Sequence, residues 1–322
     1  MTVIHLDTHW GGNYHRLIMP MLRLERTHGI QLFWIQSLEE LKGIDLDLVD
    51  NIIVSRKLAV SNYQAFRDML DKHGIKLIFD NDDYWNLNEE NPAKPMYDHV
   101  IGPQVKDTAK ICDVIWTPSK ELGKQMKKLN KKAEIVFINN AIDPDDKQWT
   151  HLRTTKHPNK RLKFGYTGLA SHRADVKLIG HSFKHKFLTC VEGEGFEEIL
   201  NPSKTFKAKT VWEYATAYRN IDVSLAPLED NIFNRCKSDL KVTEAAWSGS
   251  AIIASNVTPY KEVIKHNETG ILCSDKAEWR EAIESMTKER ARELAANLYE
   301  DLKDCPDHNI DLVNEKRLKY LL

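Results

Sequence analysis

Short apolar runs alternate with amphipathic stretches along the whole chain. In the first half, six runs have the length and the bounding turn residues of buried strands. They are TVIHLD (2–7), QLFWI (31–35), NIIVS (51–55), IKLIFD (75–80), DVIWTP (113–118) and AEIVFI (133–138). Helical patterns separate most of them, for example at 13–27, 61–73 and 119–129. Strands that alternate with helices predict a parallel sheet covered on both faces.

A second series of the same kind follows a polar stretch, KQWTHLRTTKHPNKR (147–161). Its apolar runs are LKFGYTG (162–168), KFLTCV (186–191), IDVSLAP (221–227), SAIIAS (250–255) and GILCS (270–274). The end of the chain reads as largely helical, with an interruption near 305–306. The pattern therefore predicts an α/β fold of two Rossmann-like, doubly wound domains that face a cleft. We place the first domain at 1–155 and the second at 156–305.

Composition narrows the class of protein. The chain has 322 residues, a net charge of −1 and five scattered cysteines without a CxxC pair, so neither a zinc site nor a disulfide framework is expected. Without a signal pattern or an apolar run long enough to span a bilayer, a cytoplasmic location is expected, in the host cell if a phage encodes the chain. Residues 120–163 hold twelve Lys/Arg and five Asp/Glu. This basic stretch suits an anionic membrane surface or nucleic acid, and equally a solvated helix and linker.

The loops that follow strands are the places to look for ligands, because doubly wound sheets bind them at the carboxyl ends of their strands. In DTHWGGNYHR, Gly11 and Gly12 permit close backbone approach, and Arg16 lies one helical turn further on. A plain tight turn is an equal alternative for this loop. The loop FGYTGLASHRAD offers Thr167 and Gly168 at the matching position of the second domain.

The stretch FNRCKSDLKVTEAA (233–246) begins a helix with two lysines in its first turn. Cations are disfavoured at the positive end of a helix, so an anion is expected there. The expected donor-binding residues of this stretch are Lys237, Ser238 as the N-cap, Asp239, Leu240, Lys241 and Glu244. Glu244 is expected to accept from a ribose diol. The alternative is an exposed helix with a Lys241–Glu244 pair.

Carboxylates that could assist a reaction follow the strand at 75–80. In FDNDDYWNL, Asp82 and Asp83 are candidates for orienting an acceptor hydroxyl or acting as a general base. Asp80-Asn81-Asp82 formally reads as a DxD metal motif, and N-capping of the next segment is a further alternative. His172, spaced by three from Asp175 on one helix face, is another catalytic candidate.

Several of these strings resemble one enzyme family. The stretch DVSLAPLEDNIFNRCKSDLKVTEAAWSGSAIIASNVTPYKEVIKHNETGIL (222–272) resembles the donor-binding half of GT-B glycosyltransferases of the family-4 type, also called glycosyl transferases group 1. FINNAID resembles the end of that family's first domain. GGNYHRLIMPMLRL and FDNDDYWNL resemble a subgroup of phage and surface-polysaccharide gene sets.

The resemblance implies a GT-B architecture whose last helix, 306–322, returns to the first domain. It implies that Glu244 holds the nucleotide ribose. It also implies a glutamate eight residues earlier, which normally contacts the transferred sugar, but Cys236 stands there. The family's usual diphosphate-binding pair is not evident, so Arg16, Lys237 and Lys241 are expected to replace it.

The implied reaction moves a sugar from a nucleotide sugar, with UDP as the expected carrier, to a hydroxyl, with retention and without a metal or other cofactor. Two acceptors stay open: hydroxymethylated bases of phage DNA, and a surface or lipid-linked glycan with peripheral membrane contact. A nucleotide-sugar-binding protein without transfer activity is the alternative of a different class. It is suggested by Cys236.

Overall fold

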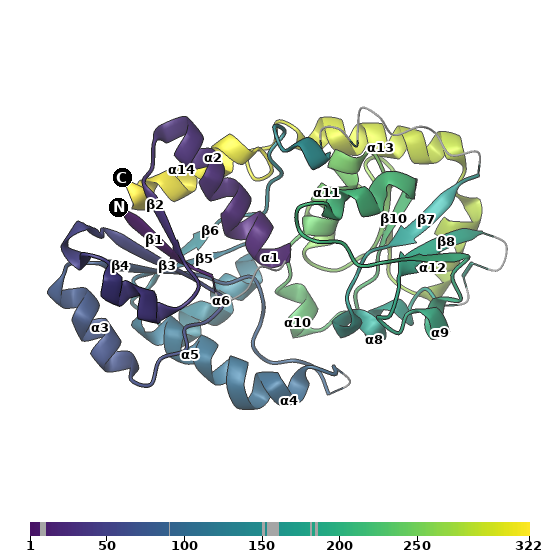
Figure 1. The fold of residues 1–322 in the computed structure, drawn as a ribbon. Coiled ribbons are helices and arrows are strands. Elements are labelled where there is room, and N and C mark those ends of the chain that lie inside the picture. The colour runs from purple at the N-terminus through teal and green to yellow at the C-terminus, as the bar shows by residue number, and fades with distance from the viewer. Residues whose placement is uncertain (7–10, 90, 150–151, 153–160, 181, 184–185) are drawn as a thin grey trace.

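Two six-stranded parallel sheets lie side by side in the computed structural model (Figure 1), which describes all residues except 7–10, 90, 150–151, 153–160, 181 and 184–185. The first sheet has the order β2-β1-β3-β4-β5-β6. Its strands are β1 (Thr2–His5), β2 (Leu32–Ile35), β3 (Asn51–Ser55), β4 (Lys76–Asp80), β5 (Val114–Thr117) and β6 (Glu134–Phe137). Strand order reverses between β1 and β3, so the loops after these two strands border the expected ligand position.

The second sheet has the order β12-β11-β10-β7-β8-β9, the Rossmann arrangement, with its reversal between β7 and β10. Its strands are β7 (Lys163–Tyr166), β8 (Phe187–Val191), β9 (Lys204–Phe206), β10 (Val223–Ala226), β11 (Ala251–Ser255) and β12 (Ile271–Cys273). The predicted α/β fold with two doubly wound sheets is confirmed. The sequence pattern missed β9, because three residues between polar neighbours give no apolar run.

Helices cover both faces of the first sheet (Figure 1). They are α1 (Gly11–Asn13), α2 (Met19–His28), α3 (Tyr63–Lys72), α4 (Lys94–Met96), α5 (Gly102–Ile111) and α6 (Lys120–Leu129), with π-helical turns at Tyr14–Ile18 and Tyr97–Ile101 and 3₁₀ turns at Leu38–Gly43 and Leu46–Leu48. Side-chain caps fix where two of them begin. The side-chain oxygen of Asn62 accepts from the Ala65 amide, and the Ser119 hydroxyl accepts from the Leu122 amide.

The second sheet carries α8 (Arg173–Val176), α9 (Glu197–Leu200), α10 (Ile232–Arg235), α11 (Leu240–Ser248), α12 (Lys276–Ser285) and α13 (Lys288–Leu302), with 3₁₀ turns at Ala170–His172, Tyr214–Asn220 and Tyr260–Glu262. The chain then returns to the first domain, where α14 (Ile310–Leu321) packs against α2 (Figure 1). The predicted boundary between 155 and 156 lies outside the described residues.

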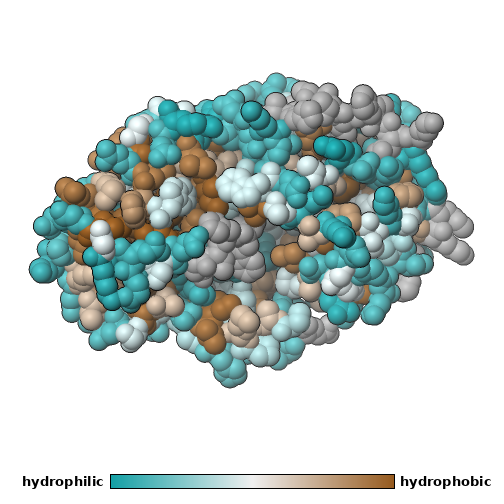
Figure 2. Space-filling model, viewed as in Figure 1, coloured by the Kyte–Doolittle hydropathy of each residue, from teal (hydrophilic) through white to brown (hydrophobic). Residues whose placement is uncertain are grey.

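Each sheet separates two apolar cores. In β3, Ile52 and Val54 face one core and Ile53 the other, and β11 divides Ile253 and Ile252 in the same way. Alternation of this kind is why both sheets read as continuous apolar runs. On the face shown in Figure 2, apolar residues gather mainly over the first domain. In the part of the chain that the structure describes, no helix is long and apolar enough to cross a bilayer.

The returning helix α14 is bound to the first domain through buried polar groups. Pro20 has no N–H to offer the carbonyl of Arg16, four residues earlier. The Arg317 guanidinium donates to this carbonyl over 3.0 Å, and the Asn314 side chain donates to the Pro20 carbonyl over 3.1 Å. Arg317 is fully buried, and burial together with the charge of Arg16 lowers its pKa to about 9. The C-terminal helix is therefore bound to the backbone of the first helical region by two buried side-chain donors.

Candidate active site

One short segment joins the second domain to the first across the cleft. This connecting segment, Phe233–Asp239, runs from α10 into α11, and most of its residues contact the first domain. Phe233 packs with Leu87 and Tyr97, and the Ser119 hydroxyl donates to the Arg235 carbonyl over 3.4 Å. At its end, Asn140 donates to the Ser238 hydroxyl and Asn139 to Asp239, over 2.9 and 3.0 Å. The segment that the sequence assigned to a donor anion is thus also an interdomain contact.

Cys236 occupies the position where the resemblance implies a sugar-binding glutamate. Its side chain is fully buried and packs into the apolar core of the first domain, among residues such as Leu122 and Val105. Burial raises the pKa of its thiol to about 12. Cys236 therefore supplies neither a charge nor a carboxylate oxygen to a bound sugar, and its packing ties the connecting segment to the first domain.

Lys237 forms an ion pair across the cleft. Its ammonium lies 2.8 Å from one carboxylate oxygen of Asp83, whose other oxygen accepts from Arg56 over 3.0 Å. Burial would raise the pKa of Asp83, but Lys237 and Arg56 outweigh burial and hold it at about 2. Arg56 has a φ of +60°, a strained conformation for a residue with a side chain. It follows β3 at the strand reversal of the first sheet.

The two candidate catalytic carboxylates have opposite environments. Burial and the neighbouring charge of Asp83 raise the pKa of Asp82, whereas that of Asp83 is lowered. A Cβ added to Gly12 would lie 2.7 Å from an Asp82 oxygen, so the glycine permits this close approach. Neighbouring carboxyl groups whose pKa values are pushed apart are typical of acid–base pairs. The structure thus brings Asp82 and Asp83 together with the glycine loop, of which Gly11 begins α1.

Lys241 and Glu244 form the centre of the second-domain site. The Lys241 ammonium donates to the Thr167 hydroxyl, the Tyr214 hydroxyl and Glu244 over 2.7, 2.8 and 2.9 Å. The same Glu244 oxygen accepts from Tyr218 over 2.6 Å. Although burial opposes its charge, Glu244 raises the pKa of Lys241 well above the ordinary value. Thr167 directly follows β7, and Lys241 and Glu244 lie on α11, which follows β10, so the group lies at the strand reversal of the second sheet, where a ligand is expected.

Sequence reasoning missed His15, which lies against this group from the first domain. Its Nε2 is 3.9 Å from Glu244, and its Nδ1 has no hydrogen-bond partner among the residues that the structure describes. Burial lowers the pKa of His15, so the ring is neutral near pH 7, and Nδ1 is left for a ligand or a water. The only signal in the sequence was its place in the glycine loop, next to Arg16.

Arg16 does not face the cleft as predicted. It is buried, and its guanidinium donates twice to Asp80, over 3.0 and 2.7 Å, and further to Asn140 and the Ile138 carbonyl. A bidentate pair of this kind is held in place inside the domain. Arg16 therefore positions the end of β4, and its guanidinium is bound inside the first domain and not directed at a diphosphate in this structure. This pair also commits Asp80, the first carboxylate of the DxD triplet.

The helix start of α11 also differs from the prediction. The helix begins at Leu240, so Asp239 and not Ser238 is the N-cap residue, although the Ser238 hydroxyl accepts from the Leu240 amide over 3.4 Å. The Asp239 carboxylate turns away from the helix and accepts from His308 over 2.8 Å. Because Asn140 also donates to Ser238, the polar groups before α11 bind protein neighbours as well as the helix end.

His172 and Asp175 share one face, as their spacing predicted, with 2.7 Å between Nδ1 and the carboxylate. Asp175 also accepts from Asn234 over 2.8 Å, which links this pair to α10. His172 lies near enough to Asp83 to help lower the pKa of that carboxylate. An alanine at Gly168 would meet the Tyr166 hydroxyl, with 2.1 Å to its Cβ, so this loop requires glycine.

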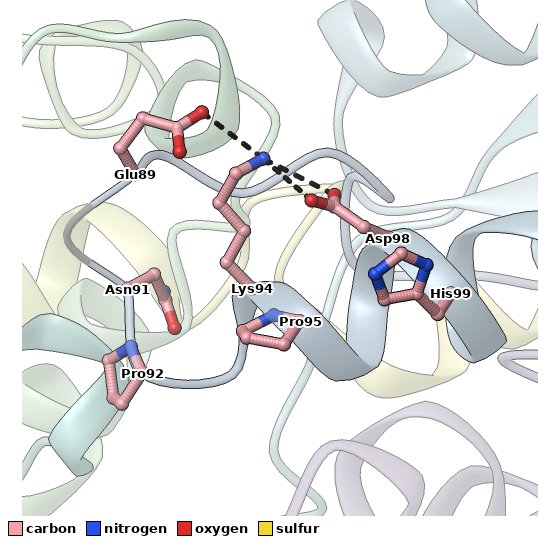
Figure 3. Close-up of a pocket in the computed structure, with 7 residues that line it drawn as sticks. All are labelled: Glu89, Asn91, Pro92, Lys94, Pro95, Asp98 and His99. Carbon is pink, nitrogen blue, oxygen red and sulfur yellow. Dashed lines mark hydrogen bonds and ion pairs between the residues drawn. The ribbon is translucent and has the colours of Figure 1, made fainter.

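A pocket lies on the first domain (Figure 3). It is lined by Glu89, Asn91, Pro92, Lys94, Pro95, Asp98 and His99. Asn91 donates to the Ser171 carbonyl of the second domain over 3.2 Å, so this rim reaches the His172 loop. Lys94 bridges Glu89 and Asp98 across the pocket, as Figure 3 shows. Within the described residues, no group of three or more His, Cys, Asp or Glu side chains is arranged to hold a metal.

Comparison with known proteins agrees with this arrangement. Residues 183–289 match the profile of the family described as glycosyl transferases group 1. Among curated proteins, none matches the sequence.

Solved structures share the fold at low identity. Anabaena HepE in complex with UDP-glucose is 12% identical, has a TM-score of 0.63, and the match covers 99% of this chain and 98% of that one. A glycosyltransferase from Rickettsia africae is 15% identical, with a TM-score of 0.59 and coverage of 99% and 97%. Sucrose-phosphate synthase from Thermosynechococcus elongatus is 13% identical, with a TM-score of 0.59 and coverage of 84% and 72%.

The chain has the GT-B fold, and the profile match together with this fold indicates a glycosyltransferase. The resemblance to group 1 enzymes is confirmed at this level. The narrower phage and surface-polysaccharide subgroup stays a prediction.

The ion pair across the cleft can be tested by titration. Replacing Lys237 by methionine should raise the pKa of Asp83 from about 2 by about one unit or more, because a neighbouring cation is removed. In the wild type, the pair stabilises the domain contact above about pH 4 and loses this contribution as the pH falls through about 2. NMR of the isotope-labelled Asp83 carboxyl carbon measures the pKa of Asp83 in the wild type and in Lys237→Met. Lys124→Met is the control. An Asp83 pKa that is the same in Lys237→Met and wild type would mean that the two side chains do not pair in solution.

Proposed function

We propose that the chain transfers a sugar from a UDP-sugar to a hydroxyl acceptor with retention of configuration. The observation that carries this proposal is the buried group of Lys241, Glu244 and Thr167 at the strand reversal of the second sheet, faced by His15 from the first. A fixed ammonium and a carboxylate at this position suit the diphosphate and the ribose of a nucleotide. HepE, which shares the fold, is described with UDP-glucose, and this supports UDP as the carrier.

Negative charge grows on the β-phosphate as the bond to the sugar breaks. Lys241 is held as a cation by Glu244, and Lys237 is a cation with a carboxylate partner that a phosphate can replace. Cations already in position stabilise a developing charge without reorganisation at the moment of reaction. In the resting structure, Asp83 therefore occupies the place at Lys237 that the donor diphosphate takes on binding.

Release of Asp83 from Lys237 also has a consequence for the acceptor. Asp83 and Asp82 lie together beside Gly12 and the strained Arg56, on the first-domain side of the cleft. Once Lys237 binds the diphosphate, the Asp83 carboxylate keeps only Arg56 of its two cationic partners. It is then available to accept a hydrogen bond from an acceptor hydroxyl, with Asp82 beside it as the group of higher pKa.

The lysines of α6 point to an acceptor that carries phosphate groups. The Ser119 contact with Arg235 places the start of α6 at the cleft, and the lysines of this helix run away from it. Several of them have local partners, such as Lys124 with Glu121 over 3.2 Å. A chain of phosphates bound along α6 would reach the cleft, which suits hydroxymethylated DNA and also a phosphorylated or lipid-linked glycan.

Binding of a nucleotide sugar without transfer remains the second candidate. Cys236 favours it, because a buried thiol stands where the resemblance implies a sugar-binding carboxylate. Lys237 and Ser238 follow Cys236 in the connecting segment and could contact the sugar in its place. Both of them already bind residues of the first domain.

Donor turnover separates these functions. The protein is incubated with UDP- and GDP-sugars and with hydroxymethylcytosine DNA, lipid-linked glycan or no acceptor, and nucleoside diphosphate and product are followed by mass spectrometry. We expect UDP release that depends on one acceptor and continues in EDTA, because Lys237 and Lys241 carry the charge stabilisation. Tight UDP-sugar binding without any turnover would favour the second candidate. Loss of turnover in EDTA with recovery in Mn²⁺ would contradict the metal-independent site.

Glu244→Gln tests the ribose contact. The variant keeps the shape but loses a charge, so the donor KM should rise about ten-fold or more, given about 1.5–3 kcal/mol for a charged hydrogen bond. The kcat should change less, because the ribose is held before and during transfer alike. The wild type should discriminate against a 2′-deoxyribose donor far more than the variant does.

The control for this substitution is Tyr218→Phe, which removes one partner of Glu244 without removing the carboxylate. The melting temperatures of both variants show whether the fold tolerates the change around the buried Lys241. Full discrimination between ribose and deoxyribose donors in Glu244→Gln would place the ribose elsewhere.

A further inference from the structure

The link between α13 and α14, residues 303–309, carries a cysteine beside a buried histidine where the chain crosses back to the first domain (Figure 1). His308 Nε2 lies 2.8 Å from an Asp239 oxygen, and its Nδ1 lies 3.4 Å from the Cys305 sulfur. The His308 amide donates to the Cys305 carbonyl over 2.9 Å, which closes the turn and holds both side chains on one side. Carboxylate, imidazole and thiol thus form a continuous chain of hydrogen bonds.

This arrangement places a cation next to the thiol. Burial would lower the pKa of His308, but Asp239 outweighs burial and raises it to about 10, so the ring is protonated near pH 7. Asp239 also accepts from Asn139, which keeps its carboxylate directed at the ring. The hydrogen bond from His308 lowers the pKa of the Cys305 thiol. A thiol beside an imidazolium is the usual setting of a reactive cysteine.

The other cysteines have the opposite setting. Cys305 is partly exposed, whereas the remaining four, all within the described residues, are buried: Cys112, Cys190, Cys236 and Cys273. Burial raises the pKa of each of these four thiols to about 12. They provide the unreactive, buried reference for the reactivity of Cys305.

Other charged groups near the thiol are paired with partners of opposite charge. Lys265, near enough for its pKa to be influenced by Cys305, is paired with Asp301. On the link itself, Asp307 is paired with Lys316 over 2.7 Å. His308 is therefore the charged group in direct hydrogen-bond contact with the sulfur.

We propose that Cys305 is a modification site, a thiol activated by His308 and Asp239 that hydroperoxides oxidise. The thiolate sulfur attacks one peroxide oxygen, an S–O bond forms as the O–O bond breaks, and the leaving hydroxide or alkoxide takes up a proton. Sulfur is oxidised to the sulfenic acid and the peroxide is reduced to water or an alcohol. The added oxygen lies between Sγ and Nδ1 and disturbs the hold of His308 on Asp239. Because His308 and Asn139 hold Asp239 in place and α11 begins at the next residue, loss of the His308 contact loosens the start of the donor-side helix.

Site-resolved alkylation tests the activation of the thiol. With iodoacetamide at pH 7, Cys305 should label at least about ten-fold faster than any of the four buried thiols, because it supplies more accessible thiolate. In His308→Asn, the Cys305 rate should fall about ten-fold at pH 7 and recover at pH 10, where the thiol ionises without help. This change in pH profile separates activation from a purely structural role of His308. Equal pH profiles in the variant and the wild type, or no preference for Cys305, would overturn the proposal.

Oxidation is followed in the same protein. After mild treatment with hydrogen peroxide, a dimedone adduct should appear at Cys305, and hydrogen exchange at the first amides of α11 should become faster. Cys305→Ser treated in the same way should show neither change. An adduct without faster exchange would contradict the link to α11, and the absence of an adduct would contradict the oxidation itself. Neither readout depends on nucleotide-sugar transfer.

Discussion

The ion pair between Lys237 and Asp83 is the interaction on which the arrangement of the cleft depends. It joins the connecting segment of the second domain to the loop after β4 in the first, with Arg56 as the second cation on the same carboxylate. The neighbouring residue Cys236 packs in the first-domain core and supports the same contact between the domains. Under the proposed function, a donor diphosphate that binds Lys237 competes with Asp83, and donor binding is then coupled to the domain contact through one ammonium.

The returning helix α14 contacts the first domain through buried charged side chains. Arg16 is bound by Asp80 inside the first domain, and Arg317 of the returning helix donates to the Arg16 carbonyl. Removing one member of a buried pair leaves the other charge without compensation, which costs about 3–5 kcal/mol. The Arg317 and Asn314 side chains, which donate to the carbonyls of Arg16 and Pro20, fix α14 on this part of the first domain. On the cleft side, by contrast, the Lys237–Asp83 pair is partly exposed, with about a fifth of each side chain accessible.

Much of the fold could be predicted because it follows from local pattern. Apolar runs bounded by turns marked every strand except β9, whose three residues are too few. The pairing of Lys241 with Glu244 also followed from their spacing on one helix face. Partners far apart in the sequence could not be predicted. Lys237 and Asp83 are separated by 154 positions, and Arg16 and Asp80 by 64, and no local rule says which carboxylate a given cation meets. For this reason, the sequence alone does not show that Asp80 binds Arg16 inside the first domain.

Calorimetric titration with UDP tests the competition at Lys237 most directly. Asp83→Asn should bind UDP more tightly than the wild type, because the competing carboxylate is gone. Lys237→Met should bind it about ten-fold or more weakly, given about 1.5–3 kcal/mol for a charge-assisted contact. In the double variant, the gain from Asp83→Asn should disappear, since no ammonium remains to be released. Equal UDP affinity in Asp83→Asn and wild type, or the same gain with and without Lys237, would contradict the account.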